Sequence, residues 1–272
     1  RHHHAVARFV RNSVALSMND LTPLIERARD LLRAAQRITA FTGAGISTDS
    51  GIPDFRGPNG LWTKNPLAEK ASNIRVYLKD EEVRIAGWKA SSDRQLRSVE
   101  PNVGHHALVE LERRGQLHGL VTQNVDGLHV GAGNSRELVH EVHGTWQFTR
   151  CISCREQRPV EETLKRVDAG EADPKCLKCG GLMKRDVILF GEALVEEVIA
   201  AALKAAEEAD LILAIGSSLN VMPAANVVPR GKAAGAKVVI INGQPTEMDN
   251  YADAFLLGDI SELLPALVAI PD

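Results

Sequence analysis

The hydrophobic residues follow two alternating patterns along the chain. Short, mostly apolar runs bounded by glycine or polar residues predict buried strands at residues 38–41, 120–122, 211–215, 238–241 and 255–257, and the run at 211–215 is continuously apolar. Helical spacing of apolar positions predicts helices at residues 22–35, 106–114, 195–208, 224–234 and 260–270, with Thr22 as the first N-cap and Pro23 in the first turn. Strands that are apolar on both faces are typical of a parallel sheet covered by helices, so we expect a doubly wound, Rossmann-like α/β fold.

Two stretches interrupt this alternation. Residues 58–102 are charged and loop-rich with weak helical patterning, and residues 145–186 carry all the cysteines. We predict that these insertions form a small helical module, which also carries the cysteines, beside a main domain made of residues 18–57, 103–144 and 187–272. Residues 1–17 contain three consecutive histidines before Met18, and we expect them to be an expression tag.

Composition narrows the class of function. The chain is 44% hydrophobic and 25% charged, as in ordinary globular proteins, and its net charge is only -3. No basic surface is indicated, so we expect no direct nucleic-acid binding. No apolar stretch approaches the ~18–20 residues that span a bilayer, so we expect no membrane insertion.

The first strand runs into a glycine turn, with Gly43, Ala44 and Gly45 followed by Ser47. Glycines let the backbone approach a pyrophosphate, although a turn that only needs positive φ has the same composition. Thr48 occupies the third glycine position of the dehydrogenase fingerprint, and no acidic residue ends a second strand at the usual distance. A nucleotide site is therefore plausible, but a hydride-transfer enzyme is disfavoured.

Three further motifs carry chemical groups, and each also has a purely structural interpretation. Asp54, Phe55 and Arg56 lie in a glycine-bracketed loop that folds over a ligand or is a surface loop with an internal ion pair. The residues Gln123, Asn124, Val125 and Asp126 follow the strand at 120–122, where amide and carboxylate groups hold ribose hydroxyls or a carboxamide, or merely cap a turn.

His143 is the third candidate. An ordinary histidine pKa of ~6.5 allows it to accept a proton near neutral pH, but a lone histidine is more often structural.

The cysteines form two pairs, Cys151 with Cys154 and Cys176 with Cys179, separated by 21 residues. Each pair has the spacing of a zinc knuckle, and two knuckles complete a tetrahedral site. Disulfides and free thiols are the alternatives. Four thiolates leave no position for an activated water, so such a zinc is structural. The cysteine usage also suits a reducing compartment, and we expect a cytoplasmic protein.

These motifs, together with residues 190–192, 216–219 and 241–242, occur in the order found in sirtuins. The resemblance covers the chain from about Leu24 to Ile270, and the chain is similar to bacterial members of the family. It implies an NAD-dependent protein-lysine deacylase, most simply a deacetylase, which transfers the acyl group to ADP-ribose and releases nicotinamide. It also implies a cleft between an NAD-binding domain and the zinc module, with acylated lysines of proteins as substrates.

The resemblance assigns roles by position. His143 is the implied base and Asn124 a second catalytic residue. The implied NAD contacts are Gly43, Ala44, Gly45, Ser47, Asp54, Phe55, Arg56, Trp62, Gln123, Asn124, Val125, Asp126, Gly216, Ser217, Ser218, Asn242, Gly243 and Ile260. The implied peptide contacts are Phe190, Gly191, Glu192, Asn220 and Val221.

Two departures from the family pattern stand out. Lys184-Arg185 replaces an Arg-Pro pair, and we expect only a changed entry to the next strand. Relatives that remove succinyl or malonyl groups carry a Tyr and an Arg three residues apart within the stretch 84–97, whereas this chain has Trp88 and Ser91. We therefore expect a neutral acyl group, acetyl or a longer aliphatic chain.

Three other functions remain open at this level. The same cleft suits mono-ADP-ribosyl transfer to a protein. A non-catalytic NAD sensor is a second alternative, although the presence of His143 and Asn124 argues against it. A dehydrogenase is the alternative suggested by the fold alone.

Overall fold

The computed structural model describes residues 18–54, 60, 64, 66–92 and 98–269. Its main sheet has six parallel strands in the order β3-β2-β1-β7-β8-β9. These strands are β1 (Ile38–Thr42), β2 (Leu117–Thr122), β3 (Val139–Glu141), β7 (Leu211–Ile215), β8 (Lys237–Asn242) and β9 (Ala254–Leu257). All five strands predicted from the apolar runs are confirmed, and β3 is an additional short edge strand.

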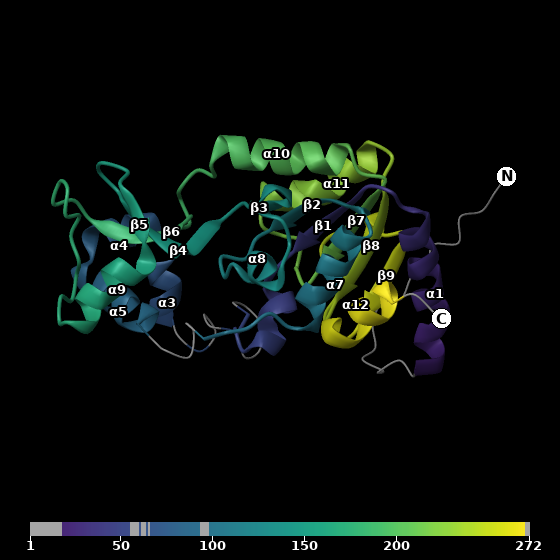
Figure 1. The fold of residues 1–272 in the computed structure, drawn as a ribbon, viewed down its shortest axis with the longest axis horizontal. Helices are drawn as coiled ribbons and strands as arrows, with labels where there is room; N and C mark the ends of the chain where they lie inside the picture. The colour runs from purple at the N-terminus through teal and green to yellow at the C-terminus, as the bar shows by residue number, and fades with distance from the viewer. Residues whose placement is uncertain (1–17, 55–59, 61–63, 65, 93–97, 270–272) are drawn as a thin grey trace.

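Helices cover both faces of this sheet (Figure 1). On one face lie α1 (Met18–Ala34), α7 (Val103–Arg113) and α12 (Ile260–Val268), and on the other lie α10 (Glu196–Glu207) and α11 (Val227–Ala233). The side chains of β1 show the alternation directly, because Ile38 and Ala40 join the first core and Phe41 the second. The Rossmann-like α/β prediction is therefore correct.

The strand order reverses at β1: β2 and β3 are added on one side of it, and β7, β8 and β9 on the other. This strand pairs with β2 on one side and with β7 on the other, although β7 is far away in sequence. Loops that leave the carboxyl ends of two such strands separate from each other, and ligands of doubly wound sheets bind in the resulting crevice. The remaining short elements are η1 (Ala44–Ser50), which directly follows β1, and α8 (Leu128–Ala132), η2 (Arg136–Leu138), η3 (Ala224–Asn226) and η4 (Asp249–Tyr251).

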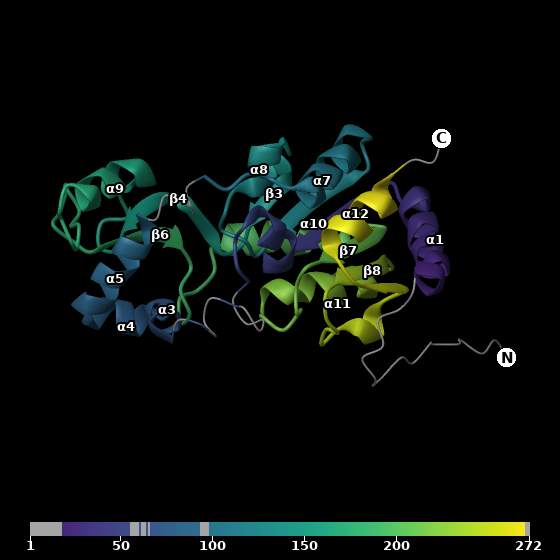
Figure 2. The same cartoon turned by 90° about the horizontal axis from the view of Figure 1, so that it is seen from below.

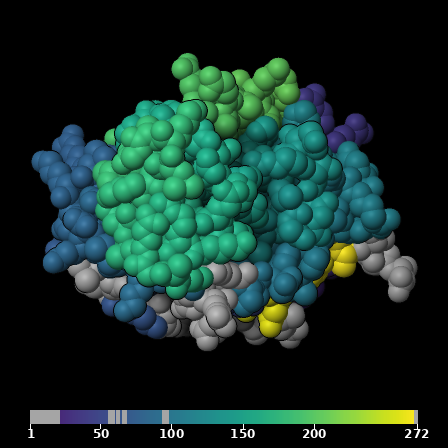
Figure 3. All heavy atoms as spheres, turned by 60° about the vertical axis from the view of Figure 1, so that its left-hand side comes forward, coloured from purple at the N-terminus to yellow at the C-terminus, as the bar shows by residue number. Residues whose placement is uncertain are grey.

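A second, smaller module lies at one end of the molecule (Figures 1 and 2). Its antiparallel sheet has the order β5-β4-β6, and Figure 3 shows this end as a lobe of its own. The module contains β4 (Gly144–Cys151), β5 (Gln157–Pro159), β6 (Met183–Val187), α3 (Pro66–Ala71), α4 (Ile74–Lys79), α5 (Glu81–Ser91) and α9 (Val160–Asp168). Trp88 of α5 packs against Leu164 of α9 and Met183 of β6 in a separate core.

The structure differs from the sequence predictions at two places. The first helix begins at Met18, so Pro23 lies inside it and Thr22 is not its N-cap. The stretch predicted to be loop-rich contains α3, α4 and α5, and the side chains of Asn73 and Asp80 cap the last two. These helices are short, and few of their side chains that the structure describes are buried, so their apolar periodicity is weak in the sequence. The exact domain boundaries remain a prediction.

Candidate active site

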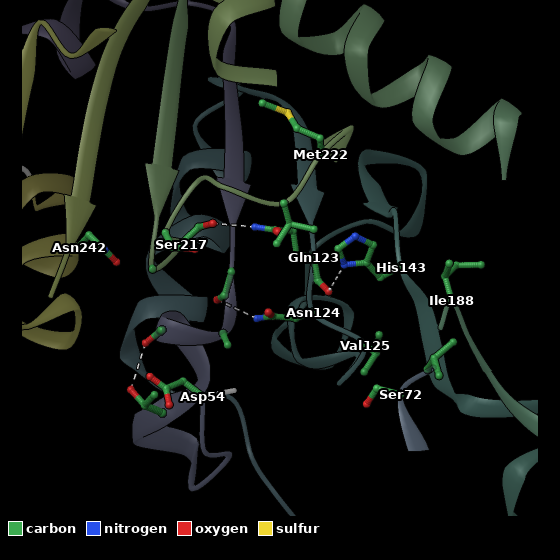
Figure 4. Close-up of a pocket in the computed structure, with 18 of the residues that line it drawn as sticks. Asp54, Ser72, Gln123, Asn124, Val125, His143, Ile188, Ser217, Met222 and Asn242 are labelled. Carbon is green, nitrogen blue, oxygen red and sulfur yellow. Dashed lines mark hydrogen bonds between the residues drawn. The ribbon is translucent and has the colours of Figure 1, made fainter. Parts of the chain in front are cut away.

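A cavity of about 1100 Å³ lies along the carboxyl edge of the main sheet and reaches toward the smaller module. The loops that follow β1, β2, β7 and β8 all contribute to it, which places Gly43, Gln123, Gly216 and Asn242 around one space (Figure 4). His143, which follows β3, lies at the side nearer to the smaller module. Groups up to 199 residues apart in sequence therefore meet because the parallel strands end at one edge.

The glycine turn is fitted tightly against the loop after β7. A side chain at Gly43 would place Cβ 2.6 Å from the carbonyl oxygen of Gly216. A side chain at Gly45 would place Cβ 2.7 Å from the Cα of Gly216. The Gly45 N–H donates to the same carbonyl over 2.9 Å. Only glycine allows this backbone contact, which leaves the turn open to a ligand on its cavity side.

Two amides after β2 are held in fixed orientations. The Gln123 side chain donates to Ser217 Oγ over 2.7 Å, and the Asn124 side chain donates to the Gly43 carbonyl over 3.1 Å (Figure 4). Each bond connects β2 with a neighbouring loop across the crevice. The two amides are therefore positioned before any ligand binds. The Asn124 side chain uses its N–H groups on the Gly43 carbonyl and Ser47 Oγ and offers its amide oxygen to the cavity, whereas Gln123 offers one N–H and its amide oxygen.

Behind Asn124 lies a buried network with a defined direction of hydrogen bonding. Ser47 Oγ donates to the Asp126 carboxylate over 2.8 Å and accepts from the Asn124 side chain over 3.2 Å. His105 Nδ1 accepts from the Asn102 backbone N–H, which leaves Nε2–H pointing toward Ser47 Oγ at 3.4 Å. Burial raises the pKa of Asp126, opposed by its bonds from the Leu128 N–H and Ser47, and burial lowers the pKa of His105 to about 4.

A second buried chain supports the same loop from below. Thr42 Oγ donates to Thr122 Oγ over 2.8 Å, and Thr122 Oγ also accepts from the Asn124 backbone N–H over 3.0 Å. Since the Thr42 hydroxyl proton is used, Thr42 Oγ accepts from His129 Nε2 over 2.8 Å. Burial lowers the pKa of His129 well below its usual value, so this histidine is neutral. Thr122 and His129 begin and end the polar motif around residues 123–126 and had no role assigned to them from the sequence, whereas Thr42 and His105 belong to no sequence motif.

His143 is set up to accept a proton. Its Nδ1 is 3.1 Å from the Gln123 carbonyl oxygen, which can only accept, so Nδ1 carries the hydrogen and Nε2 carries the free electron pair. Burial lowers its pKa below the usual value, partly opposed by the bond to the Gln123 carbonyl. His143 is therefore neutral near pH 7 and presents one basic nitrogen.

The far end of the cavity is polar. Asn242, Gly243 and Ile260, which are predicted NAD contacts, line it together with Gln244 and Asp259, which the sequence analysis did not identify. The Asn242 side chain donates to the Gln244 carbonyl, and Asp259 caps the first turn of α12. This end offers amide and hydroxyl groups rather than a cationic pocket.

The opposite end is apolar and bordered by the loop 189–192. The Phe190 N–H donates to the Ser72 carbonyl, and its carbonyl accepts from the Ile74 N–H, so both backbone groups are used. The Glu192 carboxylate accepts from the Leu189 N–H and lies 3.1 Å from the buried Lys184 ammonium. These contacts fix the loop while leaving Phe190 about half exposed.

Most predicted site residues line this cavity, and a few do not. Those that line it are Gly43, Ala44, Gly45, Asp54, Gln123, Asn124, Val125, His143, Phe190, Gly191, Glu192, Gly216, Ser217, Ser218, Val221, Asn242, Gly243 and Ile260. Ser47 and Asp126 lie in the buried network behind it, and Asn220 accepts a hydrogen bond from Ser218 Oγ beside it. Phe55, Arg56 and Trp62 lie outside the described residues.

Lys184-Arg185 does more than change the entry to β6, so that expectation was wrong. The Arg185 guanidinium donates to Ser91 Oγ over 3.0 Å, to the Ser91 carbonyl over 3.0 Å and to the Trp146 carbonyl over 3.1 Å. It also lies over the Trp146 ring. Arg185 thereby ties α5 to β4 and β6, a link that no local sequence pattern indicates.

The four cysteines gather at the tip of the smaller module. Their Sγ atoms all lie within 4.8 Å of one another, with Cys151 and Cys179 at 3.5 Å and Cys154 and Cys176 at 3.6 Å. A tetrahedral zinc with Zn–S bonds of ~2.3 Å needs S···S distances of about 3.8 Å, whereas a disulfide needs ~2.05 Å. The four thiols therefore fit one structural zinc, as predicted.

Among the described residues, no helix is both long and apolar enough to cross a bilayer.

Comparison with known proteins agrees with this geometry. The Sir2 family matches residues 43–223 of the chain. The chain is 42% identical over 231 residues to NAD-dependent protein deacetylase 2 of Streptomyces coelicolor. The aligned region covers 85% of this chain and 96% of that protein.

Two solved structures are similar throughout. One is a Sir2 histidine variant with a deacetylated p53 peptide and 3′-O-acetyl ADP ribose, at a TM-score of 0.82 and 32% identity, covering 89% of this chain and 96% of that chain. The other is Sir2 with a p53 peptide and NAD, at a TM-score of 0.76 and 32% identity, covering 86% of this chain and 93% of that chain. The chain therefore belongs to the Sir2 family of NAD-dependent protein deacylases.

Proposed function

We propose that this deacylase removes acetyl and other neutral acyl groups from lysine side chains of proteins, with His143 as its general base. One observation carries the proposal: the hydrogen bond from His143 Nδ1 to the Gln123 carbonyl leaves a basic Nε2 on a residue that lines the cavity. The same Gln123 orients its side chain through Ser217. Gln123 therefore orients the base through its backbone carbonyl and also provides the side-chain amide that would bind the ribose.

The cavity suits NAD on two grounds. First, the glycine turn has no room for side chains against Gly216, so its backbone can approach a pyrophosphate closely. Second, the far end near Asn242 offers neutral polar groups for an adenosine. When bound, NAD supplies nicotinamide as the leaving group and ADP-ribose as the acyl acceptor. In this arrangement Gln123 and Asn124 hold ribose hydroxyls, and Val125 with the backbone near Asp126 holds the carboxamide. The predicted contacts of Phe55, Arg56 and Trp62 remain part of this proposal.

His143 then accepts the proton of a ribose hydroxyl at Nε2. Its lowered pKa keeps it neutral at pH 7, so it needs no prior deprotonation. Asn124 is the second proposed catalytic residue. The Gly43 carbonyl and Ser47 fix its side chain, and Thr122 fixes its backbone N–H. A general base of this kind contributes about 10²–10⁴ in rate.

The substrate peptide joins as an added strand between residues 189–192 and the loop 219–222. The Phe190 backbone groups are already paired with Ser72 and Ile74, and the Glu192 N–H and the Val221 carbonyl are paired within their own loops. The peptide would therefore use Gly191, the Glu192 carbonyl, the facing Asn220 and the Val221 N–H. Phe190 and Met222 are both exposed at this edge and would flank the acylated lysine. Acylated lysines of proteins are accordingly the proposed partners, and a cytoplasmic location fits four zinc-binding thiols.

Mass spectrometry of an acetyl-lysine peptide incubated with and without NAD tests the proposal. We expect NAD-dependent loss of the acetyl group with formation of O-acetyl-ADP-ribose, and a loss of about 10²–10⁴ in kcat for His143→Ala. His118→Ala, a change at a surface histidine on β2, is the matched control and should keep wild-type activity. Label transferred from NAD to protein without deacylation would instead indicate ADP-ribosyl transfer, and full activity of His143→Ala would refute the assigned base.

A further inference from the structure

The loop that connects β2 with α8 is held from the smaller module by one residue of β4. The Trp146 backbone N–H donates to the Val125 carbonyl over 2.9 Å, and its indole Nε1–H donates to the Asp126 carbonyl over 3.0 Å. Val125 lines the large cavity on the same side as His143, whereas Trp146 is not part of the lining (Figure 4). Trp146 therefore fixes the loop from outside the space that a ligand would occupy.

Both carbonyls depend on Trp146. In the part of the chain that the structure describes, neither the Val125 carbonyl nor the Asp126 carbonyl accepts a hydrogen bond from any other residue. The Asp126 carboxylate is held separately, by Ser47 Oγ and the Leu128 N–H. Loss of the indole N–H would thus leave one carbonyl of the loop without a donor while the contacts of the carboxylate stay in place.

Arg185 in turn holds Trp146. Its guanidinium lies over the indole ring, with Cζ 5.6 Å from the ring centroid, and donates to the Trp146 carbonyl over 3.1 Å. Its other donors reach the hydroxyl and the carbonyl of Ser91 at the end of α5. A planar guanidinium stacked on an aromatic face restricts the orientation of the ring. Family members with an Arg-Pro pair at these two positions cannot form this contact, because a proline side chain carries no donor.

From these contacts we infer that Trp146 and Arg185 are positioning residues for the nicotinamide end of NAD. The inference rests on the proposed function, in which Val125 and the backbone near Asp126 hold the carboxamide. Trp146 fixes the peptide groups of this loop, and Arg185 keeps the indole ring in the orientation that those bonds require. ADP-ribose contains no nicotinamide, so its affinity should not depend on the pair.

The first test compares NAD with ADP-ribose on Trp146→Phe. This substitution removes the indole N–H and keeps an aromatic ring beside Arg185, so the smaller module should remain folded. In calorimetry we expect the Kd of NAD to rise roughly threefold to tenfold, as for the loss of one hydrogen bond, while the Kd of ADP-ribose stays within about twofold. In turnover of an acetyl-lysine peptide, KM for NAD and the inhibition constant of nicotinamide should rise by a similar factor, with kcat within about twofold.

The second test concerns Arg185 and has a matched control on the same sheet. Arg185→Met should weaken NAD binding selectively, as Trp146→Phe does. The double variant should lose less than the product of the two single effects, because both residues act through one loop. Arg150→Met is the control, since Arg150 also links β4 with β6, through a bidentate pair with Asp186, but has no contact with the loop. It should leave the ratio of the two ligand affinities unchanged.

The outcomes separate this inference from the proposed function. A selective loss of NAD affinity in both variants supports the positioning role even if no acetyl group is removed, in which case the proposed function alone is refuted. Unchanged NAD affinity, or equal weakening of NAD and ADP-ribose, would show that Trp146 and Arg185 do not position the nicotinamide end. A change in the affinity ratio for Arg150→Met as large as that for Arg185→Met would also overturn the inference.

Discussion

Replacing Thr42 by valine tests whether the buried hydroxyl chain beneath Asn124 is needed for activity. Valine has nearly the same shape as threonine, so the substitution removes one hydroxyl without opening a cavity. In the native protein this hydroxyl accepts from His129 and donates to Thr122. Thr122 retains its bond from the Asn124 N–H, whereas His129 Nε2 loses its partner and His129 Nδ1 already has none in the described structure.

The expected loss of stability follows from these contacts. A buried donor left without an acceptor costs about 1–3 kcal/mol, and the lost bond to Thr122 adds about 0.5–1.5 kcal/mol, partly offset by the more apolar side chain of valine. We expect the free energy of unfolding to fall by about 2–3 kcal/mol. Thr122 Oγ is then free to rotate and Asn124 is less firmly placed, so kcat/KM should fall roughly tenfold, equivalent to ~1.4 kcal/mol.

Thr39→Val is the matched control. Thr39 lies on the same strand, is equally buried, and donates to the Ala205 carbonyl of α10, away from the cavity. Its replacement should lower the free energy of unfolding by about 1 kcal/mol and leave kcat/KM unchanged. Urea unfolding followed by circular dichroism and steady-state kinetics on an acetyl-lysine peptide measure both quantities. A Thr42→Val protein that is as stable as Thr39→Val and fully active would show that the chain does not position Asn124.

Three further predictions concern the base, the zinc and the glycine turn. Because burial lowers the pKa of His143, the neutral base persists below pH 6.5, and we expect kcat/KM to decline only as pH falls through a value lower than 6.5; a decline centred above 6.5 would contradict this. Cys176→Ser should reduce the zinc content from about one atom per chain, measured by mass spectrometry, and lower the melting temperature, whereas an unchanged zinc content and melting temperature would contradict the site. Gly45→Ala should weaken NAD binding in calorimetry and lower stability by about 1–3 kcal/mol, because its Cβ would meet Gly216 Cα at 2.7 Å; unaltered binding would contradict the close fit.

Local signals predicted much of the fold. The strand at 38–42 is visible because Ile38, Ala40 and Phe41 form a short, mostly apolar run before a glycine turn, and all five strand residues are buried. The cysteine pairs are equally visible, since each zinc knuckle is formed within four residues. A helical module was predicted at residues 58–102, but its individual helices could not be located, because α3, α4 and α5 are short and few of their described side chains are buried.

The sequence by itself determined the α/β class, the order of the motifs, the zinc ligands and the identity of the candidate base. Only the tertiary structure decided that Ser47 and Asp126 lie behind the cavity, that Gln123 and Ser217 bond across it, and that Arg185 occupies the space beside Ser91. The physical reason is the range of the interactions. Helices, knuckles and buried strands follow from neighbouring residues, whereas the site depends on which strands become neighbours in the sheet, and parallel pairing brings together residues that the chain itself separates by 70 or more positions.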